Sequence, residues 1–83
     1  MSGGRIFKVL YFGLLAERRG LAEENVTSAA SSPADLYQEL DAEYRLGLST
    51  GSFRVAVNDE FANWDDVISN EDTIAFLPPM SGG

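Results

Sequence analysis

Apolar and polar side chains alternate near the beginning of the chain. Residues 6–12 are β-branched, aromatic or aliphatic except for Lys8, which predicts a β-strand. Successive side chains of a strand point to opposite faces, so one face is expected to enter the core with Phe7, Val9 and Tyr11. The charge of Lys8 indicates that the other face is the outer one. Leu10 and Phe12 then become partly exposed apolar residues on that face.

The clearest helix is predicted to begin after Ser32. Ser32 can cap the helix, Pro33 suits its first position, and Asp35 supports the first turn. We expect the helix to end near Arg45, ahead of Gly47. Apolar side chains recur along it at helical spacing, as expected for a helix that packs one face on a sheet: Leu36, Leu40 and Tyr44.

The remaining segments complete an order of strands and helices. They are a short helix over residues 14–19, a strand over 24–29, a strand over 53–57, a short return strand from Phe61 and a final strand over 73–77. Before the final strand, Trp64, Val67 and Ile68 are expected at the edge of the core. Pro78 and Pro79 end the final strand, because proline cannot donate a hydrogen bond to a sheet.

This order predicts an α+β fold of the β-grasp (ubiquitin-like) type. One main helix packs on a mixed sheet of four or five strands. If the first and last strands pair, they run parallel, because the helix lies in a long crossover between them. With 83 residues, the chain is expected to form a single domain over 1–83, in which residues 78–83 make a flexible, extended C-terminal tail.

The composition argues against several classes of function. The chain has 13 acidic and 6 basic residues, a net charge of −7, which makes nucleic acid and anionic membranes poor partners. It lacks cysteine and histidine, so it has no thiolate nucleophile or ligand and lacks the residue most used in acid–base catalysis. No apolar run is long enough to span a membrane, and a cytoplasmic protein is expected. A carrier or binding role is therefore favoured over an enzyme that works alone.

Motifs for catalysis or metal binding are missing from the sequence. There is no phosphate-binding glycine loop, no cluster of metal ligands and no nucleophilic triad, so we expect neither a metal nor a permanently bound cofactor. Adjacent carboxylates occur at Glu23-Glu24, Asp65-Asp66 and Glu71-Asp72. Because neighbours in sequence point apart on regular structure, such pairs are expected on the solvated surface.

The C-terminal end offers chemistry that the rest of the chain lacks. After Pro78-Pro79 the sequence ends in Met80, Ser81, Gly82 and Gly83. Glycines can thread a narrow tunnel, and the extended tail would reach about 20 Å. A partner could adenylate the α-carboxylate of Gly83, and a sulfur nucleophile could convert the mixed anhydride to a thiocarboxylate. The alternative is a frayed end without function, since Met-Ser-Gly-Gly also opens the chain.

The same end resembles that of a known family. Residues 75–83 read Ala-Phe-Leu-Pro-Pro-Met-Ser-Gly-Gly, which is similar to the Phe-Phe-Pro-Pro-x-x-Gly-Gly ending of the small subunits of molybdopterin synthase, a family of ubiquitin-like sulfur carriers. Residues 8–12 look like the opening strand of that family, and residues 56–58 look like its middle. The sequence departs from the family pattern at three places. Leu77 replaces an aromatic residue, Asn70-Glu71-Asp72 replaces the usual Asp-Gly-Asp turn, and Ser81 stands where Ala or Thr is common.

The resemblance implies a role in sulfur transfer during molybdenum cofactor biosynthesis. An ATP-using, ubiquitin-activating-like adenylyltransferase would adenylate Gly83, and sulfur would then be installed as a thiocarboxylate. The large subunit of molybdopterin synthase would receive the tail within a heterotetramer and convert cyclic pyranopterin monophosphate to molybdopterin. By this resemblance the chain is not an enzyme alone but the sulfur-donating subunit of a sulfurtransferase complex.

The resemblance also suggests which residues face the partner. Phe12 matches an exposed aromatic residue at the end of the family's first strand, and Phe61 matches an apolar residue after its Val-Asn turn. Leu77 matches the second aromatic residue before Pro-Pro. An apolar patch on a small acidic domain is typical of a partner site. The alternative is that these three side chains complete the core.

Other functions fit the same sequence. Sulfur carriers for thiazole synthesis or tRNA thiolation share the fold and the Gly-Gly end but commonly lack the preceding Pro-Pro. A ubiquitin-like protein modifier would form isopeptide bonds through Gly83. In a plain interaction domain, removal of Gly82 and Gly83 would change nothing.

Overall fold

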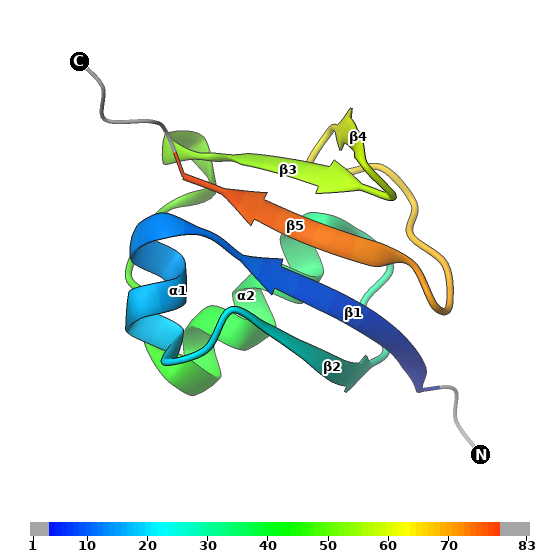
Figure 1. Ribbon diagram of the computed structural model, residues 1–83. Coiled ribbons are helices and arrows are strands. Elements are labelled where there is room, and N and C mark those ends of the chain that lie inside the picture. Colours follow the sequence, from blue (N-terminus) through cyan, green and yellow to red (C-terminus); the bar gives the residue numbers. More distant parts are fainter. Residues whose placement is uncertain (1–3, 79–83) are drawn as a thin grey trace.

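A computed structural model describes residues 4–78 of the chain and shows one sheet with a long helix behind it (Figure 1). The strand over 73–77 has the predicted bounds, and the other predicted strands are present with small shifts at their ends. Neither α-helix in this part of the chain is long and apolar enough to cross a membrane. In chain order, the elements are β1 (Arg5–Tyr11), α1 (Gly13–Arg19), β2 (Glu23–Ser28), α2 (Pro33–Tyr44), the 3-10 helix η1 (Thr50–Ser52), β3 (Arg54–Val57), β4 (Glu60–Ala62) and β5 (Thr73–Leu77).

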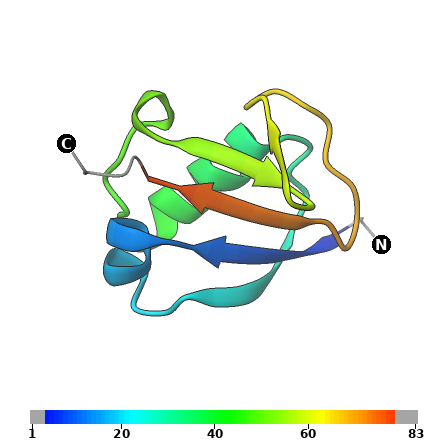
Figure 2. The same cartoon turned by 45° about the horizontal axis from the view of Figure 1, so that its top comes forward.

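The strands form one mixed, five-stranded sheet in the order β2-β1-β5-β3-β4. At its centre, β1 and β5 run side by side in parallel (Figure 1 and Figure 2), and the other neighbours pair antiparallel. The helix α2 covers the inner face. This is the predicted α+β arrangement of the β-grasp type, with one main helix on a mixed sheet. Of the predicted tail, residues 79–83 lie outside the described residues.

The start of α2 follows from its sequence. The hydroxyl oxygen of Ser32 accepts a hydrogen bond from the backbone N–H of Asp35 at 3.2 Å, and Pro33 occupies the first turn, where its missing N–H costs nothing. The helix turns one face to the sheet and buries Leu36, Tyr37 and Leu40.

The end of α2 lies where the sequence predicts it, near Arg45 and ahead of Gly47. The helix stops at Tyr44, and Arg45 rather than Gly47 takes the left-handed cap position, with a φ of 56°. The backbone N–H of Arg45 donates to the carbonyl oxygen of Asp41 at 2.7 Å, and the N–H of Gly47 donates to the carboxylate of Asp41 at 2.8 Å. Asp41 therefore closes the helix before the glycine is reached.

The core lies between α2 and the inner face of the sheet. Phe76 of β5 is fully buried at its centre, with its ring stacked on Trp64 at 6.1 Å and edge-on to Tyr37 at 5.4 Å. Aromatic contacts of this kind contribute about 0.5–1.5 kcal/mol beyond the burial of surface. The strand that leads into the tail is thus anchored by its own aromatic residue. The inward side chains of β1 are also buried, as predicted: Phe7, Val9 and Tyr11.

Two turns hold non-glycine residues in the left-handed region of backbone conformation. Asn58 and Asp59, with φ of 53° and 72°, form the tight turn between β3 and β4. Glu71 has a φ of 73° in the turn before β5. It stands at the glycine position of the Asp-Gly-Asp turn in the family that the sequence resembles. The N–H of Glu71 donates to the carbonyl oxygen of Ile6 at 2.7 Å, which joins this turn to the start of β1.

The segment before that turn corrects one expectation. Ile68 is buried, as predicted, but Val67 is 82% exposed and does not contact the core. The N–H of Ile68 donates to the carbonyl oxygen of Ser31 at 3.1 Å, which fixes the backbone with the Ile68 side chain inward. The preceding side chain, Val67, therefore points to solvent.

Candidate functional site

The outer face of the sheet carries a row of apolar residues that crosses four strands. In the register of the sheet, Leu10 of β1 lies beside Ala75 of β5. Ala75 in turn lies beside Ala56 of β3, which pairs with Phe61 of β4. The row therefore has two small side chains between two large ones. Because alanine fills so little space, the face is hollowed between Leu10 and Phe61.

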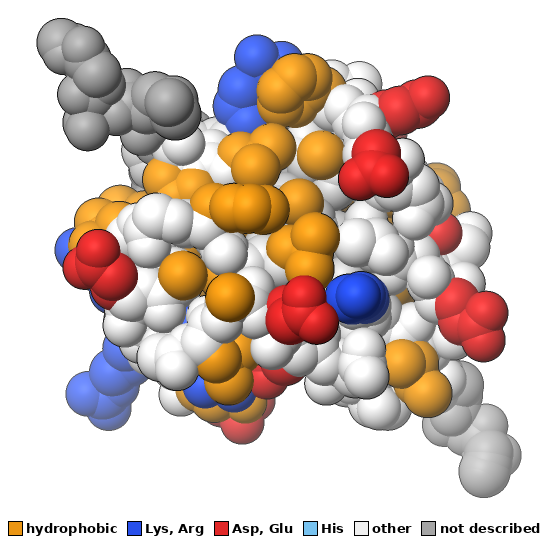
Figure 3. Space-filling view, viewed as in Figure 1, with side chains coloured by type: hydrophobic (Ala, Val, Ile, Leu, Met, Phe, Trp, Pro, Cys, Tyr) orange, Lys and Arg blue, Asp and Glu red, His pale blue; other side chains and the backbone are white. Residues whose placement is uncertain are grey.

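This hollow is a shallow cavity of about 240 Å³, which we call the apolar groove. Figure 3 shows apolar side chains gathered in a band over this face, with most charged side chains around it. A large exposed apolar patch with a polar rim is typical of a surface that binds another protein. The groove is lined by Leu10, Phe12, Ala56, Asp59, Phe61, Ala75 and Leu77.

The three residues predicted to face a partner all line the apolar groove. Phe12 is 44% exposed, Phe61 is 65% exposed and Leu77 is half-buried, so none of them belongs to the buried core. Phe12 does not end the first strand, as the sequence suggested, but is the N-cap residue of α1. The structure brings the three side chains together, and their contact with a partner stays a prediction.

Sequence reasoning missed the floor of the groove and the cation at its edge. The alternation of residues 53–57 puts Arg54 and Ala56 on one face, but only the strand register places Ala56 beside Ala75. The same register sets Arg54 beside Leu77, and the guanidinium carbon of Arg54 lies 4.2 Å from the centroid of the Phe61 ring. A cation over an aromatic face contributes about 0.5–1 kcal/mol at an exposed site.

The base of the tail lies at one end of the apolar groove. Leu77 lines the groove and ends β5, and Pro78 follows it, half-buried. A Cβ atom added to Gly13 would lie 3.7 Å from Cγ of Pro78, so the start of α1 and the base of the tail are neighbours. The other residues predicted to form the reactive tail, Pro79, Met80, Ser81, Gly82 and Gly83, lie outside the described residues.

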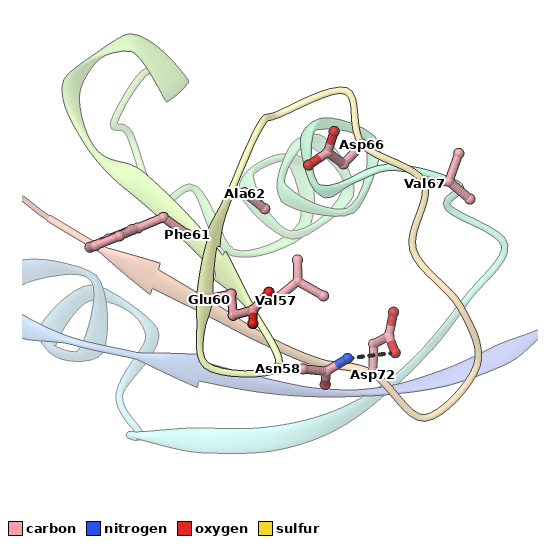
Figure 4. A pocket seen from close by; sticks show the side chains of 8 residues that line it. All are labelled: Val57, Asn58, Glu60, Phe61, Ala62, Asp66, Val67 and Asp72. Atoms are coloured by element: carbon pink, nitrogen blue, oxygen red, sulfur yellow. Dashed lines mark hydrogen bonds between the residues drawn. The ribbon is translucent and has the colours of Figure 1, made fainter.

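A second, polar hollow lies beside β4 and the loop that precedes β5 (Figure 4). Asp72 accepts hydrogen bonds from the Asn58 side chain at 3.0 Å and from the Ser69 N–H at 2.7 Å. Asp66 accepts one from the Asn63 N–H at 2.9 Å. These carboxylates hold the loops in place. In the described part of the chain, no group of three or more acidic, histidine or cysteine side chains could hold a metal ion.

One ion pair is largely buried, and it connects α1 to β2. Nε and Nη2 of Arg19 donate to the two carboxylate oxygens of Glu24 at 2.9 and 2.7 Å, and the Tyr11 hydroxyl donates to the same carboxylate at 2.6 Å. The hydrogen bonds from Arg19, reinforced by that from Tyr11, hold the pKa of Glu24 below its usual range. Burial, together with the Glu24 charge, raises the pKa of Tyr11, which stays a neutral donor. The cluster stabilises the fold and lies apart from the groove lining.

Similar proteins were found among families and curated sequences. The profile of the ThiS family matches residues 9–83. The molybdopterin synthase sulfur carrier subunit of Escherichia coli (strain K12) is 30% identical over 81 residues, which cover 94% of this chain and 100% of the relative. The sulfur carrier subunit of Haemophilus influenzae is 30% identical over 82 residues, with the same shares of 94% and 100%.

Solved structures agree with this likeness. A chain in the complex of subunits 1 and 2 of the molybdopterin-converting factor from Helicobacter pylori has a TM-score of 0.63 and 28% identity, and the match covers 94% of this chain and 99% of that one. The small archaeal modifier protein 1 of Haloferax volcanii has a TM-score of 0.79 and 21% identity, with 93% and 100% covered, and shows the shared fold alone. Since the profile and the curated relatives match nearly the whole chain, the chain belongs to the ThiS family of ubiquitin-like sulfur carriers, which includes the small subunits of molybdopterin synthase.

Proposed function

We propose that this chain is the sulfur carrier subunit of a molybdopterin synthase and that Gly83 carries the sulfur. Similarity over the full length of two such subunits supports this role. The lack of cysteine and histidine in the sequence favours a carrier over an enzyme that works alone. The observation that carries the proposal is the apolar groove, which lies beside the base of a tail that ends in Gly82-Gly83.

The proposed chemistry takes place at the α-carboxylate of Gly83. An adenylyltransferase of the ubiquitin-activating type transfers AMP from ATP to this carboxylate and releases pyrophosphate. A hydrosulfide equivalent then attacks the acyl carbon and expels AMP, which leaves a thiocarboxylate. Because the sequence has no cysteine, no thiol of this chain competes for the activated acyl group. ATP serves the activating enzyme in the cytoplasm, and the carrier needs no cofactor of its own.

The apolar groove is the proposed docking surface for the large subunit of the synthase. The Helicobacter pylori structure is a complex of two subunits of a molybdopterin-converting factor, which supports such an assembly. A partner seated on Phe12, Phe61 and Leu77 lies next to Pro78, where the tail begins. From there an extended tail reaches about 20 Å, enough to enter an active site in that partner. The expected assembly is a heterotetramer, in which sulfur passes to cyclic pyranopterin monophosphate.

Intact-mass analysis tests the sulfur-loading step. The purified chain is incubated with its cognate adenylyltransferase, ATP and a sulfur donor, and a sample without ATP is the control. We expect one oxygen to be replaced by sulfur only in the complete mixture. The loaded chain is then added to the large subunit and cyclic pyranopterin monophosphate, and molybdopterin is expected to form. A chain that gains no sulfur contradicts the proposal.

A ubiquitin-like modifier is the second candidate, because an archaeal modifier shares the fold and a Gly-Gly end can form an isopeptide bond. Conjugate ladders in cell extract that vanish when Gly83 is removed would favour modification. Complementation of a strain without the molybdopterin synthase small subunit would favour the carrier. A sulfur carrier for thiazole synthesis or tRNA thiolation would take up sulfur but fail in that complementation.

A further inference from the structure

Arg54 stands where the apolar groove meets the base of the tail. It pairs with Leu77, the last residue of β5, across the ladder between β3 and β5. Its guanidinium carbon lies 4.2 Å from the centroid of the Phe61 ring, so the side chain is held against one wall of the groove while remaining exposed. Arginine offers a rigid fork of N–H donors that matches a carboxylate, and holding the fork in place reduces the entropy lost on binding.

The side chains of four of the other five basic residues are engaged elsewhere in the fold. Lys8 and Arg19 form ion pairs with glutamates of β2. Arg5 and Arg18 donate to backbone carbonyl oxygens, and Arg45 ends α2. Within residues 4–78, no carboxylate forms an ion pair with the arginine of the groove. That cation is therefore available to a group outside the described domain.

Opposite charges lie near the two ends of the groove. Asp59, in the turn after β3, lines the end away from the tail. Arg54, at the start of β3, lies outside the lining but pairs with Leu77 at the tail end. Apolar contact has no direction, so the alanine floor alone does not determine which way round a partner sits. Charges at the two ends do determine the orientation of a partner that carries the complementary charges. If that partner were reversed, like charges would face each other.

We propose that Arg54 determines partner specificity by pairing with a carboxylate at the mouth of the channel that receives the tail. The inference rests on the proposed function, because it assumes a partner that accepts the tail. The pair selects the docked orientation in which the tail enters the channel. An exposed pair of this kind contributes more to the association rate and to specificity than to affinity. Its effect weakens as the salt concentration rises, because salt screens exposed charges.

Binding of the full chain to the cognate large subunit, measured at low and high salt, tests this role. Arg54→Glu is expected to weaken binding roughly tenfold or more at low salt, and Arg54→Gln by a smaller factor. Arg45→Glu makes the same charge change at the end of α2 and is the matched control, with an expected change of less than about twofold. Thermal unfolding of each variant verifies that the domain is folded.

The possible outcomes separate this inference from the proposed function. If Arg54→Glu binds like the wild type, or if Arg45→Glu loses as much affinity, Arg54 has no special role. Restored binding of Arg54→Glu to a large subunit with one acidic residue of the channel mouth changed to lysine supports the pair. A wild-type chain that neither binds the large subunit nor takes up sulfur overturns the proposed function and this inference together.

Discussion

Arg19 and Glu24 fasten the short helix α1 to the edge strand β2 through two hydrogen bonds of 2.9 and 2.7 Å. Their side chains are only 17% and 16% exposed. The guanidinium of Arg19 also lies 3.6 Å from the centroid of the Tyr44 ring, so the pair connects α1 to α2 as well. Removing one side chain of the pair leaves the other charge partly buried without a counter-charge, which destabilises the folded state.

Glu24→Gln is expected to lower the free energy of unfolding by about 2 kcal/mol near neutral pH, because Arg19 loses its counter-charge. Urea titration measures the loss. Glu23→Gln is the matched control, since the Glu23 carboxylate lies 3.8 Å from Lys8 and these side chains are 61% and 50% exposed. An exposed pair contributes little, so the control is expected to unfold like the wild type. Equal losses in the two variants would show that the burial of Glu24 is irrelevant.

The same carboxylate predicts how stability responds to acid. The pKa of Glu24 is lowered in the folded protein, so its contribution is fully present above the unfolded value of about 4.3 and is lost as the pH falls through the folded value. Between about pH 6 and pH 3, the wild type is expected to lose more unfolding free energy than Glu24→Gln. Urea titrations across this range give both curves, and parallel curves would contradict the assignment.

Glu71→Gly is expected to stabilise the domain by about 0.5–1 kcal/mol. Glu71 has a φ of 73°, a conformation that costs a side-chain-bearing residue roughly 1–2 kcal/mol, while glycine adopts it freely. Part of the gain is offset by the greater freedom of glycine in the unfolded chain. Glu71→Ala keeps the strained conformation and serves as the control. If alanine stabilises as much as glycine, the charge of Glu71 and not its backbone is the cause.

The local elements of this fold could be predicted from the chain because their signals are short-range. Ser32 caps α2 through Asp35, as expected from adjacent residues alone. The end of α2 near Arg45 was also predicted, from the glycine that follows it, and the structure adds that the N–H of Arg45 donates to the carbonyl oxygen of Asp41.

The apolar groove depends on residues that are far apart in sequence. Its floor joins Ala56 to Ala75, and its walls come from β1 and β4. An alanine carries no signal of its own, and the position of Arg54 over Phe61 depends on the register of β3 with β4. Only the assembled sheet places these residues together, whereas Phe12 and Phe61 could be singled out from the resemblance.

Ala75→Leu is expected to fill the groove and weaken binding of the large subunit roughly tenfold or more. Ala75 is half-buried on the outer face, so the larger side chain can extend to solvent and the unfolding free energy changes by less than about 0.5 kcal/mol. Ala42→Leu, on the exposed side of α2, makes the same change away from the groove and should leave binding intact. Calorimetry measures binding, and normal binding by Ala75→Leu would exclude the groove as the docking surface.

Deletion of Gly83 is expected to abolish sulfur loading while the free energy of unfolding changes by less than about 0.5 kcal/mol. The core residues in the described part of the chain run from Phe7 to Phe76, well before the deleted position. Intact mass reports loading, and thermal unfolding reports stability. Ser81→Ala leaves the terminal carboxylate in place and is the control expected to load normally. A marked drop in melting temperature on deletion would mean that the end of the chain belongs to the fold.

The parallel pairing of β1 with β5 has a mechanical consequence if partners hold the carrier by its tail, as proposed. β5 lies between β1 and β3, so a pull on its C-terminal end loads two hydrogen-bonded ladders along their length. The hydrogen bonds of both ladders must then break together. In a strand pulled away from the edge of a sheet, by contrast, they break one after another. The domain can therefore be drawn out of one partner and passed to the next without being unravelled by the grip on its end.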